Sequence, residues 1–433
     1  MSVLLIQPPY MQLSEPDYSI PDSLKNGVRY LNPALLIQGS YLQKKDVSTS
    51  IIVCENINNL CDIDDYLRRN KVCLVGISCT SAWEYLETLH IAAHIKKHHD
   101  IPIVVGGWQI KSIQQKIFQD SNNIDYIIVS DSDTSMYDLY NVVSNKGALE
   151  YTSGIFTKHR GLPYDGNNSL LESFDYNFAM YPNYATYIPF VEESRGCPYS
   201  CKFCLNSCIR QCYATKSIER FEKDILNLKK FYGINFEAVL LASNFGVNAE
   251  KTRQKLRLLA DHNIFWNLEL HADNPWEHYI DLLYDAGVRK VSIGLESCSE
   301  KILKAMNKTK NPKKYLNRVS ELLKQLHANK IRTTVNILFH FEDNHKTMNE
   351  TLYFLIKNQN VIDRVRFNIM YLFDGLRSNY DGIDFKRYAI YSDFNEKLHL
   401  TPLTPDGFDS KKLISFFDTF EEIYNKRNVK IET

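Results

Sequence analysis

The strongest constraint on the fold is an alternation of short β-branched runs with segments of helical periodicity. In the first third of the chain these runs lie at residues 3–6, 50–54, 72–77, 101–105 and 125–129. Helical patterns separate several of them, and this order is typical of βαβ units in a parallel sheet. We therefore predict an α/β fold that begins with a doubly wound, Rossmann-like domain at residues 1–150.

A second series of strand patterns follows a connector. Residues 151–188 hold turn residues and many aromatic side chains without a clear period, which favours a linker packed across two domains. Further strand patterns lie at residues 190–193, 238–242, 266–271, 290–295, 333–339 and 364–371. Because helical patterns alternate with them, residues 189–375 are predicted to form a partial (β/α)6 barrel. Residues 376–433 are predicted to be a small extension with one amphipathic helix, whose apolar residues are Leu413, Phe416, Phe420 and Tyr424.

Length and charge balance limit the class of protein. Single hydrophobic cores stop growing near ~250–300 residues, so a chain of 433 residues suits several domains. Lysine plus arginine and aspartate plus glutamate both total 51, so no net field attracts nucleic acid or an anionic membrane. No apolar run reaches the ~18 residues of a membrane span, and the first residues lack the basic region of a signal peptide. We expect a cytoplasmic protein that binds neither nucleic acid nor membranes.

Five of the ten cysteines lie between residues 197 and 212, which predicts metal ligands rather than disulfides in a long intracellular chain. Cys197, Cys201 and Cys204 are spaced closely enough for one loop to hold a four-iron four-sulfur cluster through three thiolates. The fourth iron would stay open to the amino and carboxylate groups of S-adenosylmethionine (SAM). The alternatives are buried free thiols or a zinc site, although zinc usually takes four ligands in paired short spacings. The position directly after the first barrel strand favours the cluster, because catalytic groups gather at that face.

Cys208 and Cys212 continue from Cys204 at intervals of four, so a helix would place all three on one face. They would either ligate a second cluster or serve as small core residues. Two thiols cannot complete a cluster, and this favours the core interpretation.

Three longer segments carry a resemblance to a known family. These are ATYIPFVEESRGCPYSCKFC, GVRKVSIGLESCSEKILKAMNK and VGISCTSAWEYLETLHIAAHIKKHHDIPIVVGGWQI. Together they resemble the radical SAM superfamily, and within it the subfamily that carries a cobalamin-binding domain before the barrel. The resemblance covers about residues 1–375. It implies a [4Fe-4S] cluster, SAM at the open end of the barrel, cobalamin between the two domains, and an electron donor such as flavodoxin or ferredoxin.

The resemblance also implies the SAM contacts, all near the carboxyl ends of predicted strands. They are Phe203 by the adenine, Ser243 and Asn244 near the ribose, and Gly294, Leu295, Glu296 and Ser297 near the sugar and methionyl parts. Small or polar residues at strand ends are typical of ligand sites. Glu296 follows an apolar strand and needs a partner if it is buried, which favours function. Ser243 and Asn244 could equally be turn formers.

In an open parallel sheet, ligands bind beyond the carboxyl ends of the strands, which predicts one crevice in the N-terminal domain. Ser81 and Glu84 have capping-box spacing, so a helix N-terminus points at the same site. Under the resemblance, cobalamin would contact Gln7, Ser78, Thr80, Gly106, Gly107 and Ser130. Trp108 would either flank a ring cofactor or pack in the domain.

The chain departs from the family pattern in three places. No Asp-x-His-x-x-Gly occurs in residues 1–150, so any cobalamin would bind without a protein histidine. Ser130-Asp131-Ser132-Asp133 replaces the usual Gly-Glu-Gly-Glu and puts side chains where backbone would approach a ligand. Phe339-His340-Phe341-Glu342-Asp343 replaces Gly-Phe-Pro-Gly-Glu, so the substrate side of the barrel is altered.

The leading hypothesis is a cobalamin-dependent radical SAM methyltransferase that acts on an unactivated carbon and uses two SAM molecules per methylation. The alternative is cobalamin-independent dehydration, epimerisation or rearrangement of a small metabolite by the SAM-derived radical. A third interpretation is a non-catalytic cluster protein or a binding subunit. His271 and His340 are candidate acid–base residues, with ordinary hydrogen bonding as their alternative. The neutral charge favours a small molecule or a peptide side chain as substrate. The lysines between residues 301 and 314 would either attract an anionic substrate or form a solvated helix face.

Overall fold

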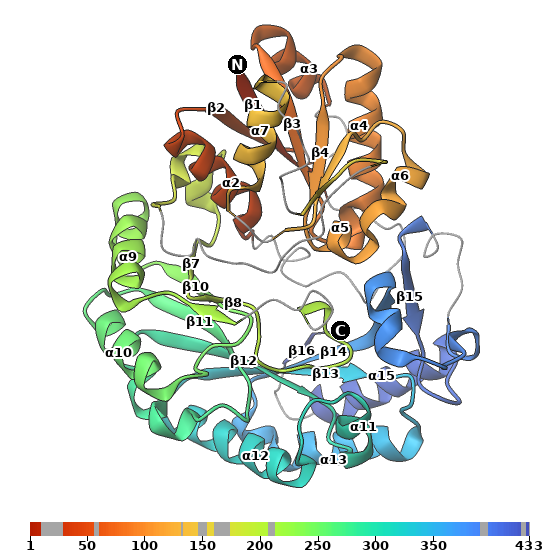
Figure 1. Cartoon of the computed structure of the whole chain (residues 1–433). Helices are drawn as coiled ribbons and strands as arrows, with labels where there is room; N and C mark the ends of the chain where they lie inside the picture. Colours follow the sequence, from red (N-terminus) through yellow and green to blue (C-terminus); the bar gives the residue numbers. More distant parts are fainter. Residues whose placement is uncertain are drawn as a thin grey trace.

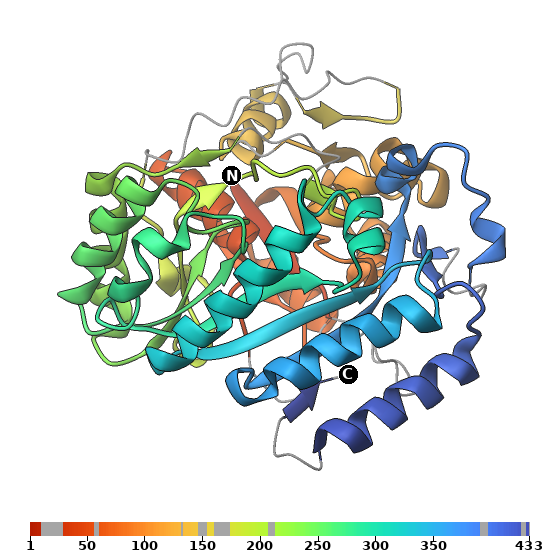
Figure 2. The ribbon, with the colours of Figure 1, turned by 90° about the horizontal axis from the view of Figure 1, so that it is seen from below.

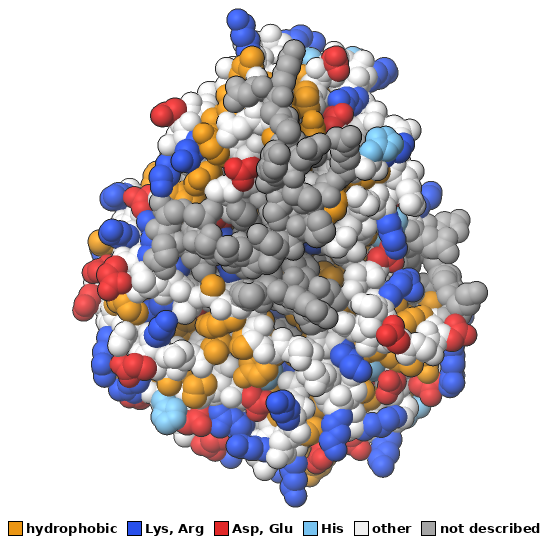
Figure 3. All heavy atoms as spheres, viewed as in Figure 1, with side chains coloured by type: hydrophobic (Ala, Val, Ile, Leu, Met, Phe, Trp, Pro, Cys, Tyr) orange, Lys and Arg blue, Asp and Glu red, His pale blue; other side chains and the backbone are white. Residues whose placement is uncertain are grey.

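The computed structural model describes residues 1–9, 29–55, 60–130, 133–145, 154–159, 174–206, 213–389, 397–425 and 430–432. Two sheets organise these residues and lie one above the other in Figure 1. Acidic and basic side chains are spread together over the visible surface (Figure 3), as expected for balanced charges. Within the described ranges, no helix has both the length and the apolar character needed to cross a membrane.

The N-terminal sheet has the order β2-β1-β3-β4-β5-β6. Its strands are β1 (Ser2–Gln7), β2 (Ser48–Val53), β3 (Val72–Ser78), β4 (Ile103–Gly106), β5 (Tyr126–Ile128) and β6 (Ile155–Phe156). The first five are parallel and agree with the predicted runs to within about two residues, whereas β6 pairs antiparallel with β5 and was not predicted. This order is a doubly wound topology, in which ligands bind where the chain reverses its direction of growth across the sheet.

Helices cover both faces of this sheet. They are α2 (Pro33–Lys44), α3 (Leu60–Arg69), α4 (Tyr85–His98), α5 (Trp108–Ile113), α6 (Ile117–Asp120) and α7 (Ser135–Asn145). Val3 and Leu5 point to the face covered by α2 and α7, while Leu4 and Ile6 point to the face covered by α3 and α4. Successive strand side chains therefore serve two separate cores, which explains the uninterrupted apolar run in β1.

The second sheet contains six parallel strands in the order β7-β10-β11-β12-β13-β14. They are β7 (Phe190–Glu192), β10 (Glu237–Leu241), β11 (Phe265–Leu270), β12 (Val288–Glu296), β13 (Arg332–Phe339) and β14 (Arg364–Phe373). Their number and positions confirm the predicted partial barrel. In Figure 2, helices α12 (Pro312–Ala328), α13 (His345–Asn358) and α15 (Ser410–Asn425) run across one face of this sheet.

The remaining barrel connections vary in length. Helices α9 (Ile218–Tyr232), α10 (Ala249–Ala260) and α11 (Glu300–Ala305) follow β7, β10 and β12. Between β11 and β12 the chain instead makes two 3₁₀ turns, Trp276–His278 and Ile280–Leu282, so this unit is not the βα unit that the sequence predicted.

The C-terminal extension adds to the barrel. Helix α15 confirms the predicted helix, and its Phe416 and Phe417 pack against Phe339 of β13. Phe417 also contacts Phe367 of β14. The side chains of Phe420 and Tyr424 lie outside the described residues. Two strands were not predicted: β15 (Leu400–Leu403) pairs antiparallel with β14, and β16 (Lys430–Glu432) pairs parallel with it.

Residues of the connector contact both domains. The Phe178 ring meets Phe231 and Tyr232 of α9 at 5.5 and 5.6 Å between centroids. The neighbouring Asn177 amide donates to Ser40 Oγ of α2 at 2.9 Å. These contacts hold the N-terminal sheet against the barrel.

Candidate functional site

A cavity of about 920 Å³ lies where the carboxyl ends of the two sheets meet. Pockets for small molecules typically measure roughly 300–1,000 Å³, so this cavity suits a large ligand. All six residues of the predicted crevice line it: Gln7, Ser78, Thr80, Gly106, Gly107 and Ser130. The barrel contributes Glu192, Arg195, Gly196, Leu241 and Ser243. The structure therefore brings the predicted crevice together with the first two barrel strands.

Backbone forms one wall of the cavity at Gly107. This residue has φ +125°, and a Cβ atom here would lie 2.3 Å from the carbonyl oxygen of Cys79. The Cys79 amide in turn donates to the Gly106 carbonyl at 2.7 Å. Two strand-end loops thus touch through backbone alone, which requires glycine and leaves room for a ligand to approach closely.

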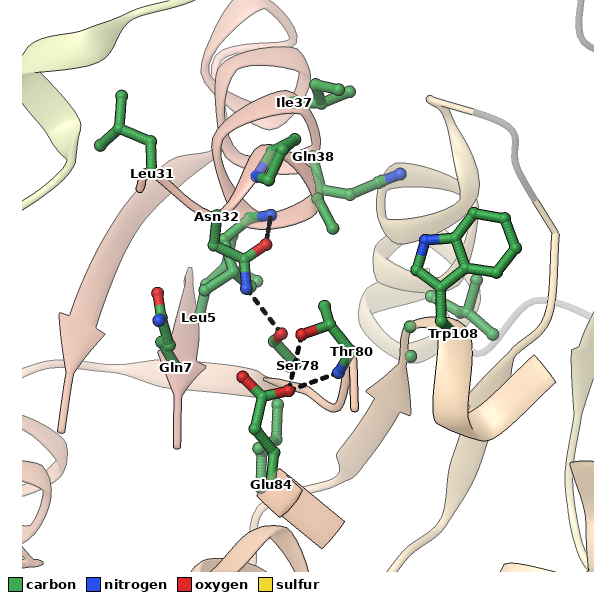
Figure 4. Close-up of a pocket in the computed structure, with 18 of the residues that line it drawn as sticks. Leu5, Gln7, Leu31, Asn32, Ile37, Gln38, Ser78, Thr80, Glu84 and Trp108 are labelled. Carbon is green, nitrogen blue, oxygen red and sulfur yellow. Dashed lines mark hydrogen bonds between the residues drawn. The ribbon is translucent and has the colours of Figure 1, made fainter. Parts of the chain in front are cut away.

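Hydrogen-bonded polar groups line another part of the cavity (Figure 4). The Glu84 carboxylate accepts from the Thr80 hydroxyl at 2.7 Å and from the Ser81 amide at 3.2 Å, which confirms the capping box. Burial raises the pKa of Glu84 to about 7, and its Oε1 has no hydrogen-bond partner among the described residues. Asn32, at the start of α2, donates to Ser78 Oγ at 2.8 Å. Neither Asn32 nor Glu84 was predicted as a site residue.

A buried ionic group joins the domains beside the cavity. Arg195 donates to Glu192 at 2.5 and 2.8 Å and pairs with Asp133 at 2.7 Å. Burial raises the pKa of Asp133 to about 6, and the guanidinium opposes this shift. These findings concern residues 130–133, where the chain differs from the family pattern. Ser130 is hydrogen-bonded to Ser135, and Asp133 makes this interdomain pair. Asp131 and Ser132 lie outside the described residues.

Trp108 and Lys111 extend the same wall of the cavity. The Lys111 ammonium lies 5.2 Å from the Trp108 ring centroid. Burial, together with the nearby charge of Arg195, lowers the pKa of Lys111 to about 7. Trp108 thus both lines the cavity and packs against a cation.

The three cysteines lie on one loop that begins after β8 (Ser194–Arg195). Cys201 is buried, and Cys197 and Cys204 are half-buried. Burial raises the pKa of all three thiols, that of Cys201 to about 12, whereas Lys308 acts to lower each of them. Among the described residues no group of three histidine, cysteine, aspartate or glutamate side chains is arranged to hold a single metal ion. Cys208 and Cys212 lie outside the described residues.

Neighbouring segments fix the backbone of the cysteine loop. Lys202 N donates to the Met306 carbonyl at 2.9 Å, and Asn307 donates to the Ser200 carbonyl at 2.8 Å. The Tyr199 hydroxyl donates to Asn274 at 3.0 Å. Three thiols on a loop held at several points suit a cluster, because thiolates are its usual ligands.

Lys308 connects the predicted SAM residues and was missed by the sequence analysis. Its ammonium lies 3.1 Å from Glu296 Oε1 and 5.9 Å from the Phe203 ring centroid. Glu296 has φ +66°, an uncommon conformation for a residue with a side chain. A Cβ atom on Gly294 would lie 2.5 Å from the Glu296 carboxylate, so glycine is needed for this pair. A buried lysine paired with a strand-end glutamate therefore marks the end of β12.

The other predicted SAM residues have different surroundings. Ser243 is exposed and lines the cavity. Asn244 is buried, and its Oδ1 accepts from the Asn274 side-chain amide at 2.7 Å. Ser297 accepts from the Ser299 amide at 3.1 Å.

Both candidate histidines are buried and neutral. His271 stacks on Tyr199 with centroids 4.0 Å apart, and burial lowers its pKa to about 2. Burial also lowers the pKa of His340 to about 3, and its Nδ1 accepts from the Glu342 amide at 3.3 Å. Neither lines the large cavity, and the buried Nε2 atom of each has no hydrogen-bond partner among the described residues.

Fold and site together define a class of α/β proteins in which a Rossmann-like domain faces a partial barrel with a three-cysteine loop. Residues 191–355 match the family model of the radical SAM superfamily, and these residues include the cysteine loop and most of the barrel strands. Two solved structures confirm the expected α/β fold, in which a Rossmann-like domain precedes the barrel.

The first of these is TsrM from Kitasatospora setae, a radical SAM methyltransferase solved with cobalamin and a [4Fe-4S] cluster bound. It superposes with a TM-score of 0.70 at 16% identity, over 86% of this chain and 73% of that chain. The second is OxsB, a cobalamin-dependent radical enzyme solved with aqua-cobalamin and SAM, with a TM-score of 0.72 at 15% identity. That match covers 99% of this chain and 73% of OxsB.

The curated relatives match a smaller part of this chain than the solved structures do. An uncharacterized methyltransferase of Pyrococcus horikoshii is 24% identical over 283 residues, or 62% of this chain and 61% of the relative. Bacteriochlorophyllide d C-12(1)-methyltransferase of Chlorobaculum tepidum is 24% identical over 237 residues, or 51% and 49%. The chain thus spans less than two thirds of the length of these relatives.

Proposed function

We propose that this chain is a cobalamin-dependent radical SAM methyltransferase that acts on an unactivated carbon. The observation that carries the proposal is the cavity of about 920 Å³ between the two sheets. Its lining runs from the strand ends of the N-terminal domain to Gly196, one residue before Cys197. A ligand in the cavity would thus contact the crevice predicted for cobalamin and the beginning of the cysteine loop at once.

The residues present suit the two cofactors. Cys197, Cys201 and Cys204 would hold the cluster, and Glu296 with Lys308 would lie beside SAM. When bound, the cluster would supply the electron for reductive cleavage of SAM, and cobalamin would supply methyl transfer. The Lys308 ammonium favours ionised thiols, because it opposes the effect of burial on each of them.

Cobalamin would be held without a histidine, since none occurs among the described residues that line the cavity. The backbone at Gly107 allows close approach of a large ring, and Glu84 offers a buried carboxyl that is partly protonated near neutral pH. Asp133 does not present an uncompensated charge, because Arg195 pairs with it.

The alternative without cobalamin remains a second candidate. The side chain of Ser130, where relatives have glycine, favours it because it narrows the approach of a ligand to the backbone. In that case the SAM-derived radical itself would act on a small metabolite. The substrate class, a small molecule or peptide side chain, the electron donor and the cytoplasmic location remain predictions from the sequence.

The test is an anaerobic reconstitution of the cluster in the presence of cobalamin, followed by desalting. Iron and cobalt contents and the ultraviolet–visible spectrum are then measured, together with 5′-deoxyadenosine formed from SAM. We expect about equal amounts of cobalt and protein, and Cys201→Ala should lose the cluster while keeping its fold. A cluster that cleaves SAM in a protein that retains no cobalt would contradict methyl transfer and support the alternative. A reduced protein that leaves SAM intact would contradict both.

A further inference from the structure

A short segment after the last parallel strand of the barrel connects the two domains. Residues 374–380, which directly follow β14, form a 3₁₀ helix that we name the strap. The Gly375 amide of the strap donates to Ser112 Oγ of α5 at 3.2 Å, and the Lys116 ammonium lies 2.9 Å from the Asp374 carboxylate. Farther along the chain, β15 lies below α6 at the right of Figure 1. The strap therefore contacts the N-terminal domain although it belongs to the C-terminal extension.

The strap also lies on the cysteine loop. Asn379 Nδ2 donates to the Lys202 carbonyl at 2.8 Å, and the Lys202 ammonium lies 5.8 Å from the Tyr380 ring centroid. Leu376 and Tyr380 belong to a buried apolar cluster against which Phe203 packs. A movement of the strap away from the N-terminal domain would therefore also loosen the loop that carries the three cysteines.

A histidine joins the strap to the N-terminal domain through two carboxylates. His399 Nε2 lies 2.6 Å from Asp120 Oδ2 of α6, and His399 Nδ1 lies 3.2 Å from Asp374 Oδ2 of the strap. An ionised carboxylate only accepts hydrogen bonds, and a neutral imidazole has a single N–H group, so only the imidazolium can donate to both partners. Loss of one proton would leave a ring lone pair facing a carboxylate oxygen.

Three other polar side chains approach these two carboxylates. The Tyr85 hydroxyl of α4 donates to Asp120 at 2.6 Å. Lys116 Nζ and Arg377 Nε lie 2.9 and 3.1 Å from Asp374. The side chains of these two cations are 52% and 48% exposed, against 17% for the histidine. Because exposed ion pairs contribute little to stability, the histidine is the main cation at this contact between the domains.

We propose that His399 is a proton-operated latch, in which the imidazolium fastens the strap to the N-terminal domain and loss of its proton loosens the strap and the cysteine loop together. The only chemical event is the transfer of one proton from the imidazolium to solvent. The latch needs no cofactor, so it is independent of the proposed function.

The direction of the pH dependence follows from the partners of the histidine. The hydrogen bond to Asp374 raises the pKa of His399 above its usual value of 6.5, and the hydrogen bond to Asp120 adds to this effect, although burial opposes it. A pKa that is raised in the folded state gives a contribution that is fully present below about pH 6.5 and is lost as the pH rises through the raised value. The strap should therefore be fastened in mildly acidic solution and loosened in alkaline solution.

The test measures amide hydrogen exchange of the whole chain without cofactors, by mass spectrometry at about pH 6 and about pH 9. Each rate is divided by that of a free peptide of the same sequence, which removes the direct effect of pH on exchange. We expect the protection of residues 374–380 to fall about tenfold or more at the higher pH, because charge-assisted hydrogen bonds are lost. Peptides from residues 198–206 should lose protection with them, whereas peptides from β12 should not.

Three substitutions separate the proton from the side chain. His399 has φ +54°, a conformation that asparagine tolerates, so His399→Asn removes the cation without backbone strain. This variant should show at about pH 6 the low protection that the wild type shows at about pH 9. His399→Arg keeps a cation at both pH values and should stay protected at both. His327→Asn, which replaces an exposed histidine at the end of α12, should behave as the wild type does.

Equal protection of the wild-type strap at the two pH values would overturn the latch. An arginine variant that loosens with pH as the wild type does would overturn it as well, and so would an asparagine variant that keeps the protection of the wild type. A loss of protection confined to the strap would overturn the connection with the cysteine loop. If His399→Asn does not fold, the wild type and His399→Arg still decide, because both comparisons rest on pH alone.

Discussion

Replacement of Arg195 by methionine is expected to weaken the contact between the two domains by about 3–5 kcal/mol, the usual cost of removing one partner from a buried ion pair. The guanidinium is shared by Asp133 of the N-terminal domain and Glu192 of the barrel. The three side chains are 11%, 4% and 5% exposed. Methionine keeps most of the apolar stem but leaves two buried carboxylates without their common cation.

The loss of stability in the Arg195→Met variant should depend on pH. Burial raises the pKa of Asp133 to about 6 in the folded protein, against roughly 3.9 in an unfolded chain. The folded state therefore binds this proton more tightly, and its stability falls as the pH rises from about 4 to about 6. Without Arg195 the pKa rises further, so the fall extends to higher pH. The Arg195→Met variant should lose more stability at about pH 8 than at about pH 5.

Urea unfolding at the two pH values provides the measurement, with Arg195→Met/Asp133→Asn as a second variant. Asparagine needs no cation, so the double variant should recover part of the loss, mainly at the higher pH. Arg68→Met removes an exposed pair with Asp65 and should change little. Loss of less than about 1 kcal/mol at both pH values would refute the claim that this ionic group holds the domains together.

Three further substitutions test the site. Gly107→Ala should destabilise the protein and abolish cobalt retention after desalting, because its Cβ would lie 2.3 Å from the Cys79 carbonyl oxygen; wild-type cobalt content would contradict this. Burial raises the pKa of Glu84 to about 7, so the wild type should lose stability as the pH rises from about 4 to about 7. Glu84→Gln should remove this loss. An equal change of melting temperature with pH in the two proteins would contradict the prediction. Lys308→Met should weaken SAM binding about tenfold or more in equilibrium dialysis, because Glu296 loses its partner, and Lys308→Arg should restore part of it; unchanged binding in Lys308→Met would exclude this role.

The parallel strands could be predicted from the sequence because each has at least one buried face, which leaves an apolar pattern in the sequence. Strand β13 was predicted at residues 333–339 and runs from Arg332 to Phe339. Strands β6, β15 and β16 are two to four residues long and join a sheet edge that forms only in the folded chain. These short strands have no apolar pattern of their own in the sequence, so their pairing depends on partners that are distant in the chain. After β11, the alternation of strand and helix patterns in the sequence predicted a helix, but the structure has two 3₁₀ turns there.

In the candidate site, sequence motifs identified those residues whose role depends on their own loop or on the local backbone. The cysteines, Gly107 and Glu296 belong to local patterns, and the strand-end rule correctly predicted that the six crevice residues line one cavity. Arg195 could not be assigned because one of its two partners, Asp133, belongs to the other domain. Lys308 could not be assigned because no local motif connects it with Glu296. For Arg195 one signal was present: it is a charged residue two positions before Cys197, where burial would demand a partner.

The cavity exists only while the two sheets face each other, and the groups that hold them there also line it. Arg195, Asp133 and Glu192 all belong to the lining. A ligand that contacts both domains therefore stabilises the same arrangement that the ionic group stabilises, and the two effects are thermodynamically coupled. Because a ligand binds only the assembled cavity, weakening the domain contact lowers ligand affinity even at positions the ligand does not touch. Asp133, which stands where the family pattern has glutamate, thus contributes to the domain contact through its pair with Arg195.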